Sequence, residues 1–316
     1  MKRKVFLVGL LIFVMSTFVI ACGGQDRSDA APADYAVLLK TLASPFWQGV
    51  RDGVINRAAE LGVSVNVYAA ISEDDIEGQV QIMQNLISRG YKAIAVAPIS
   101  PVNLNTQIAE ATGRGIYIVN IDEMVDRDNL RGLGGAVQGF VATDNVAVGR
   151  LGAGHIISLV PGGGEVAIIE GRSGNVSGED RRQGAAEAFN TAPGFNIVAS
   201  QAADWDRTLA FDLANSLINR FPNLVGIYAC NDTMAMGALE AVRMANRNII
   251  VVGTDGNPDA IDSVRAGELG ATVAQDTNAI GGIGLDLLVE AFTRSVPIDP
   301  NAEVPFRGAQ AQLITR

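Results

Sequence analysis

Polar residues that could hydrogen-bond a ligand rich in hydroxyl groups occur near the ends of several apolar runs of this chain. Asp122, Asn231 and Asp255 each come within a few residues of such a run. Arg181 and Gln275 follow or end two others. Carboxylate, amide and guanidinium groups can each bridge two neighbouring hydroxyls through paired hydrogen bonds. No nucleophile with a matching base accompanies them. The pattern therefore indicates a binding site, and we expect no catalytic residues.

Aromatic side chains accompany these polar groups, although aromatics make up only 6% of the chain. Phe46 and Trp47 are adjacent in the turn that follows the first apolar run, with Lys40 just before them, and Trp205 follows a later run. Flat rings match the C–H faces of a pyranose. Packing of the first helix onto the sheet is the alternative role for Phe46 and Trp47.

Helix capping is the ordinary alternative for the Asx residues. Asp206, Asp232 and Thr233 are good N-cap candidates, and we expect them to cap helices. Asp122, Asn231 and Asp255 could likewise be caps or turn formers. What favours a site is that carboxylates, amides, an arginine and aromatics would all meet at one cleft if the runs are parallel strands.

The apolar runs alternate with amphipathic segments of helical length, which predicts parallel sheets covered by helices. Ligands of open parallel sheets bind at the carboxyl ends of the strands, where the residues above lie. Eight or more strands could form one barrel or two open sheets. The irregular segment 123–139 favours two sheets, because a single break of that kind suggests a crossing between lobes. The expected strands are Val37–Leu39, Val63–Val67, Ala93–Ala97, Ile116–Val119, Val166–Ile169, Ile197–Ala199, Val225–Ala229 and Ile249–Val252.

Length, charge and motifs exclude several classes of function. The 316 residues suggest two domains, and a net charge of −10 argues against nucleic acid as a partner. A single histidine, His155, argues against a metal site or a catalytic triad. Gly162-Gly163-Gly164 precedes a strand and does not follow one, so it is no nucleotide fingerprint. We expect no metal and no cofactor.

The N-terminus has the pattern of an export signal. Residues 2–4 are basic, and Val5–Ile20 is almost entirely apolar. A membrane anchor helix is the alternative. The stretch Val19-Ile20-Ala21-Cys22-Gly23 is similar to the lipobox of bacterial lipoproteins, which would make residues 1–21 a lipoprotein signal peptide and Cys22 the lipidated residue. Residues 22–33 are typical of a flexible tether. Cys230 is expected to be a small buried residue.

Several stretches of the mature chain carry a family resemblance. Residues 35–316 resemble the ribose-binding branch of the periplasmic sugar-binding proteins, and within it the D-allose-binding members. The family fold is two similar doubly wound α/β lobes joined by three crossovers. The motifs are Pro45-Phe46-Trp47, Thr143-Asp144-Asn145-Val146-Ala147, Asp204-Trp205-Asp206-Arg207, Asn231-Asp232-Thr233-Met234-Ala235 and Gly253-Thr254-Asp255-Gly256.

The resemblance implies lobe boundaries and a division of the sugar contacts between the lobes. Lobe I would comprise residues 34–143 and 276–309, and lobe II residues 144–275 and 310–316. Lobe I would contribute hydrogen bonds from Lys40 and Asp122 and stacking by Phe46 and Trp47. From lobe II, hydrogen bonds would come from Arg181, Asn231 and Asp255, the opposing aromatic would be Trp205, and Gln275 lies at a crossover.

One position departs from the family pattern, because Ser44 stands where the family usually has Asn. A serine cannot span two hydroxyls as an amide can, so a water could intervene or the preferred sugar could differ.

The resemblance implies a monomeric, exported and lipid-anchored protein in the periplasm or on the outer face of the membrane. It would capture D-allose or a related hexose or pentose such as ribose by hinge closure, and deliver it to the permease of an ABC importer. A sugar sensor for a chemoreceptor or histidine kinase is an alternative in the same fold. An enzyme that uses Asp122 and Asp255 on a glycoside is an alternative of another class. A transcription regulator would need a DNA-binding headpiece where the export signal stands.

Overall fold

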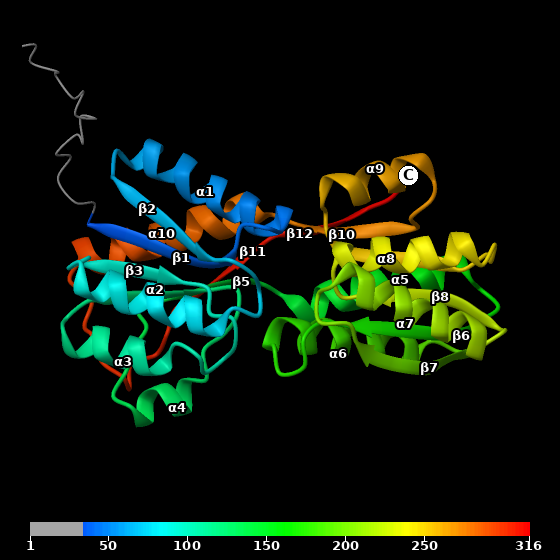
Figure 1. The fold of residues 1–316 in the computed structure, drawn as a ribbon, viewed down its shortest axis with the longest axis horizontal. Helices are drawn as coiled ribbons and strands as arrows, with labels where there is room; N and C mark the ends of the chain where they lie inside the picture. Colours follow the sequence, from blue (N-terminus) through cyan, green and yellow to red (C-terminus); the bar gives the residue numbers. More distant parts are fainter. Residues whose placement is uncertain (1–33) are drawn as a thin grey trace, which may run out of the picture. The chain divides into compact units, whose positions relative to one another are not determined.

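Two six-stranded sheets organise residues 34–316, the part of the chain that the computed structural model describes (Figure 1). The first sheet has the order β11-β5-β4-β3-β1-β2 and is parallel throughout. Its strands are β1 (Tyr35–Thr41), β2 (Val65–Ala70), β3 (Ala93–Val96), β4 (Tyr117–Ile121), β5 (Phe140–Thr143) and β11 (Phe306–Ala309). The predicted signal peptide, tether and lipidation site lie outside the described residues.

The second sheet repeats this order as β12-β10-β9-β8-β6-β7, and only β12 runs antiparallel to its neighbour. In both open sheets the strand order reverses at the same place, next to the first strand of the sheet, β1 or β6. The predicted fold class of two similar doubly wound lobes is therefore confirmed, and the single barrel is excluded. The strands are β6 (Gly164–Glu170), β7 (Phe195–Ala202), β8 (Leu224–Ala229), β9 (Ile250–Asp255), β10 (Ala271–Gln275) and β12 (Ala311–Ile314).

Helices cover both faces of each sheet, and we call each sheet with its helices the first and the second lobe. Every residue of β1 is buried, and its alternate side chains enter two separate hydrophobic clusters, one on each face of the sheet. Burial on both faces explains the continuous apolar runs. The helices are α1 (Pro45–Leu61), α2 (Ile76–Ser88), α3 (Asn105–Gly113), α4 (Arg127–Gly132), α5 (Asn145–Leu159), α6 (Val176–Thr191), α7 (Arg207–Arg220), α8 (Asp232–Met244), α9 (Pro258–Ala266) and α10 (Thr277–Thr293).

The chain passes between the two sheets three times. It crosses between β5 and β6, between β10 and β11, and between β11 and β12. Helix α10, which precedes β11 in the chain, packs beside α1 of the first lobe, although the two helices are more than two hundred residues apart (Figure 1).

The irregular segment 123–139 is not a crossing, and this prediction was wrong. The segment holds α4 and leads into β5, which pairs with β4 in the same sheet. Its backbone also stays bonded to the first sheet, since the Gln138 N–H donates to the Ile118 carbonyl at 2.7 Å. The break in the strand–helix rhythm is therefore a short helical connection within the first lobe.

A close helix contact fixes the position of α6, which carries Arg181. Helices α5 and α6 approach through Gly149 and Gly184, and a Cβ atom at Gly149 would overlap the carbonyl oxygen of Arg181. Only the absence of side chains lets the two backbones meet at this distance. Within residues 34–316, no helix has both the length and the apolar character needed to span a membrane.

Candidate ligand-binding site

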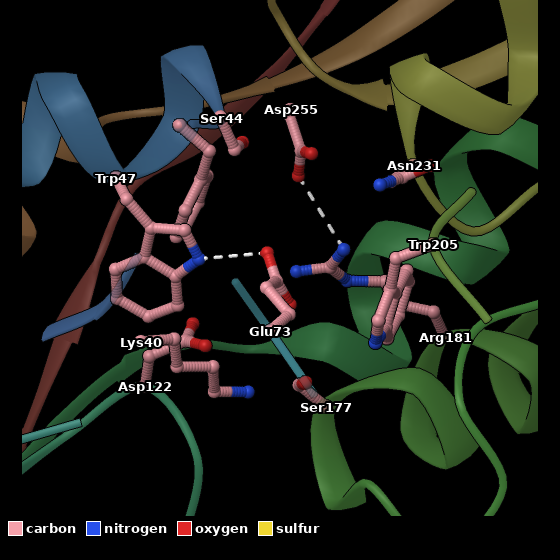
Figure 2. A pocket seen from close by; sticks show the side chains of 11 residues that line it. Lys40, Ser44, Trp47, Glu73, Asp122, Ser177, Arg181, Trp205, Asn231 and Asp255 are labelled. Atoms are coloured by element: carbon pink, nitrogen blue, oxygen red, sulfur yellow. Dashed lines mark hydrogen bonds and ion pairs between the residues drawn. The ribbon is translucent and has the colours of Figure 1, made fainter. Parts of the chain in front are cut away.

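A cavity lies at the carboxyl ends of strands from both sheets (Figure 2). It measures about 330 Å³ when the space open to solvent is counted. In each sheet the cavity lies near the point where the strand order reverses, which is where open α/β sheets generally bind their ligands. The lining residues are Lys40, Ser44, Phe46, Trp47, Glu73, Asp122, Ser177, Arg181, Trp205, Asn231 and Asp255.

Lys40 is a buried cation at the end of β1. Its Nζ lies 3.2 Å from Oε2 of Glu123 and 5.7 Å from the centre of the Trp47 ring. Burial by itself would lower the pKa of Lys40, but the neighbouring carboxylates, Glu123 foremost, outweigh burial and raise it. Lys40 therefore keeps its charge and can donate hydrogen bonds into the cavity.

Asp122 follows β4 in the left-handed backbone conformation, with φ of 60°. Its Oδ1 is buried and has no hydrogen-bond partner among the described residues. An unpaired buried acceptor costs free energy. A hydroxyl group in the cavity would supply the missing donor.

The aromatic side chains both pack and line the cavity. Phe46 and Trp47 are buried in α1 with their rings edge to face, 4.9 Å between centres. Trp205 lies on the second lobe, and its left-handed φ of 67° is unusual for a large residue. The overlap that a Cβ atom at Gly171 would make with the Trp205 ring shows how closely the backbone supports this ring.

Arg181 is held by three acceptors of the second lobe. Its Nε donates to Asn145 Oδ1 at 2.8 Å, and its Nη1 donates to the Cys230 carbonyl at 2.8 Å and faces Asp255 Oδ1 at 3.4 Å. Nη2 makes no hydrogen bond to residues 34–316, so it remains available to a ligand. The guanidinium also lies 5.8 Å from the Trp205 ring centre. The arginine is thus pre-oriented before any ligand enters.

Asp255, the last residue of β9, has a strongly perturbed acidity. Burial raises the pKa of its carboxyl group to about 7, even though Arg181 and the amide of Gln275 both favour the ionised form. The Gln275 Nε2 donates to Asp255 Oδ1 at 2.8 Å. Gln275 is not among the residues that line the cavity, and its Oε1 is buried without a hydrogen-bond partner among the described residues.

Asn231 serves as a cap and lines the cavity as well. Its Oδ1 accepts the Met234 N–H at 2.8 Å and so caps α8, which leaves the side-chain nitrogen directed into the cavity (Figure 2). Asp206 caps α7 as predicted. The capping roles predicted for Asp232 and Thr233 are wrong, because Asn231 is the N-cap residue and α8 begins at Asp232.

Asp232 is instead completely buried, next to the turn that follows β9. It accepts hydrogen bonds from the Asn257 N–H and the Thr272 hydroxyl, each at 2.7 Å. Burial raises its pKa well above the ordinary value. Its role in the described structure is to hold the turn after β9.

Ser44 is the N-cap residue of α1, but its side chain makes no capping hydrogen bond. It lines both the cavity and the wider opening next to it. The hydroxyl of Ser44 is therefore not committed to the helix. It shares this opening with the hydroxyl side chains of Thr41, Ser72 and Thr233.

Three polar residues of the site region were not predicted. Glu73 follows β2 and accepts the Trp47 Nε1–H at 2.9 Å (Figure 2). Ser177 lies in the first turn of α6, and Glu123 is buried beside Lys40. The strand-end pattern would have identified Glu73 if β2 had been extended to Ala70, since the predicted strand ended at Val67. Within residues 34–316, no group of acidic, histidine or cysteine side chains could hold a metal ion.

The two-lobed α/β fold with a polar, aromatic cavity at the strand ends is the architecture of a solute-binding protein. A family model described as "Periplasmic binding protein domain" matches residues 35–293, and the chain belongs to this family. As predicted, this is a family of binding proteins and not of enzymes.

Curated relatives and solved structures agree with this placement. The chain is 50% identical to the D-allose-binding periplasmic protein of Escherichia coli, over 92% of this chain and 94% of the relative. It is 31% identical to the ribose import binding protein of Haemophilus influenzae, over 90% and 96%. A solved structure of an ABC transporter periplasmic solute-binding protein from Actinobacillus succinogenes, with bound D-allose, has a TM-score of 0.82 at 29% identity, covering 89% of this chain and 96% of that one.

Proposed function

We propose that this protein captures a monosaccharide, D-allose or a related hexose or pentose such as D-ribose, in the cavity between its lobes. The observation that carries the proposal is the convergence of uncommitted polar groups and aromatic rings on one small cavity. Asp122 offers an acceptor, Arg181 and Lys40 offer charged donors, and Trp47 and Trp205 offer ring surface. Hydrogen bonds to hydroxyls and ring contacts to C–H faces suit a sugar.

We further propose that binding closes the two lobes, which comprise residues 34–143 with 276–309 and residues 144–275 with 310–316. A ligand that contacts both lobes at once favours the conformation in which both are within reach. The closed protein would then deliver the sugar to the permease of an ABC importer. The relatives that are named import binding proteins support this role. Lipid attachment at Cys22, on the outer face of a membrane, belongs to the same proposal and rests on the sequence pattern alone.

A thermal-shift screen over aldoses and polyols tests the ligand class, because a ligand that binds only the folded state raises the apparent melting temperature. We expect the largest shift with D-allose and smaller shifts with D-ribose. A protein whose melting temperature responds to none of the hexoses or pentoses at millimolar concentration would contradict the proposal.

A further inference from the structure

Helix α6 receives its N-terminal cap from the other lobe. Its own N-cap residue, Asn175, makes no side-chain capping bond. Instead, the Val176 N–H donates to Glu123 Oε1 at 2.6 Å, and the Ser177 hydroxyl donates to Glu123 Oε2 at 3.2 Å. Glu123 follows β4 of the first lobe, so this cap exists only while the lobes are in contact.

The other long helices of the second lobe that follow a strand cap themselves from within their own lobe. Asp144 caps α5, Asp206 caps α7 and Asn231 caps α8, each by accepting a backbone N–H of the first turn. An uncapped helix start leaves backbone donors that must find another acceptor. At α6 the acceptor of these backbone donors is the Glu123 carboxyl group, which the other lobe supplies.

Asn175 does not cap α6 because its side chain is used elsewhere. Its Nδ2 donates to the Ile99 carbonyl of the first lobe at 2.8 Å, and its Oδ1 accepts the Trp205 Nε1–H at 3.1 Å. One amide thus makes a second link between the lobes and orients an aromatic ring of the cavity.

The carboxylate of Glu123 also holds Lys40, at 3.2 Å, and its side chain is completely buried. Burial raises the pKa of Glu123, while Lys40 and the Val176 N–H act in the opposite direction. Negative charge at a helix N-terminus is favourable. If the lobes separated, Glu123 would keep only its bond to Lys40 and would lose both donors of α6.

We propose that Glu123 is a positioning residue that couples the sugar site to lobe closure, by joining Lys40 of the first lobe to the N-terminus of the helix that carries Arg181. The inference rests on the proposed function. The bonds of Glu123 to α6 and the sugar contacts of Lys40 and Arg181 form in the same closed arrangement. Each therefore stabilises the conformation that the other requires, and such coupling is reciprocal.

The test uses the full chain with Glu123→Gln, and Glu179→Gln as the matched control. Glu179 lies in the first turn of the same helix, and its carboxylate faces Arg182 and not the other lobe. We expect Glu123→Gln to weaken D-allose binding in calorimetry by about 10- to 100-fold, mainly through faster dissociation in stopped-flow fluorescence. Small-angle scattering without sugar should show a larger radius of gyration than for the wild type, and saturating sugar should restore it. Glu179→Gln should stay within about twofold of the wild type in affinity.

Two results would overturn the inference. One is an affinity and dissociation rate of Glu123→Gln within twofold of the wild type. The other is weakened binding with unchanged scattering and an unchanged dissociation rate, which would indicate a local structural role. If the wild type binds neither D-allose nor D-ribose, the proposed function fails. The scattering comparison of the sugar-free proteins still decides whether Glu123 holds the lobes together.

Discussion

The two lobes prepare their halves of the cavity differently. In the second lobe, Arg181 is bonded to Asn145, the Cys230 carbonyl and Asp255, so its guanidinium is fixed in place before a ligand enters, with Nη2 left to bind it. In the first lobe, Asp122 has a buried oxygen with no partner among the described residues. The arginine of one half is preorganised by its own network, whereas the carboxylate of the other half is left for the ligand to satisfy. Preorganised groups lose little freedom on binding, whereas an unpaired group gains most from it.

The largest test of this contrast is Arg181→Ala, because it removes the centre of the preorganised network. Asp255 and Asn145 would lose a buried donor, so we expect both the free energy of unfolding and the sugar-binding free energy to fall, by about 3–5 kcal/mol for a broken buried pair. Denaturant unfolding and calorimetry measure the two. Arg182→Ala, on the next residue of the same helix but partly exposed, is the control and should change each by less than about 1 kcal/mol. Equal effects of both substitutions would refute the network.

The second test is the pH dependence that Asp255 introduces in the preorganised lobe. Its folded-state pKa of about 7 lies above the ordinary value of 3.8. The unfolded chain therefore releases this proton at lower pH than the folded one. The contribution of Asp255 to stability is fully present below about pH 4 and is lost as the pH rises towards 7.

Relative to Asp255→Asn, the wild type should lose roughly 2–4 kcal/mol of unfolding free energy between pH 4 and 7, since each unit of pKa shift corresponds to about 1.4 kcal/mol. Denaturation of both proteins across this range gives the difference directly. Parallel stability curves for the two proteins would show that Asp255 does not titrate there.

The third test concerns the unpaired carboxylate of the first lobe. Asp122→Asn keeps a residue type that tolerates the left-handed backbone at this position. We expect sugar affinity to fall by about 1–3 kcal/mol while the stability of the sugar-free protein stays the same or rises, because no protein hydrogen bond of Asp122 is lost. Asp128→Asn, at an exposed carboxylate of the same lobe, is the control. A loss of stability as large as that of Arg181→Ala would remove the contrast between the lobes.

The smallest expected effect is at the mouth, where Ser44→Asn changes selectivity more than affinity. An amide can bridge two hydroxyls where a serine reaches one. The ratio of D-allose to D-ribose affinity should therefore shift by about tenfold or less, corresponding to at most about 1.4 kcal/mol, as measured by calorimetry with both sugars. An unchanged ratio would show that Ser44 does not contact the ligand.

The strand-end residues of the site were predictable because their positions follow from topology. Once the apolar runs are parallel strands, Lys40, Asp122, Asn231 and Asp255 must come to one edge of their sheets. All of them line the cavity in the described structure. The alternation of strands and helices predicted parallel sheets covered by helices, but it left open one barrel or two sheets, and the family resemblance implied the two lobes.

What the sequence did not predict depends on side-chain pairing or on small shifts of element ends. Glu73 was missed because β2 continues to Ala70. Glu123 was missed because its partners, Lys40 and Val176, are far from it in the chain and meet it only in the folded protein. Gln275 donates a hydrogen bond to Asp255, a pairing that strand position alone does not reveal, and its contact with a sugar stays a prediction.

The central claim is that a monosaccharide occupies the cavity between the lobes, and tryptophan fluorescence tests it most directly. The chain has two tryptophans, Trp47 and Trp205, and both line the cavity. Titration with D-allose should give a saturable change in emission that Arg181→Ala abolishes and Arg182→Ala preserves. An emission spectrum that stays constant with every hexose and pentose, together with no heat of binding, would contradict the claim.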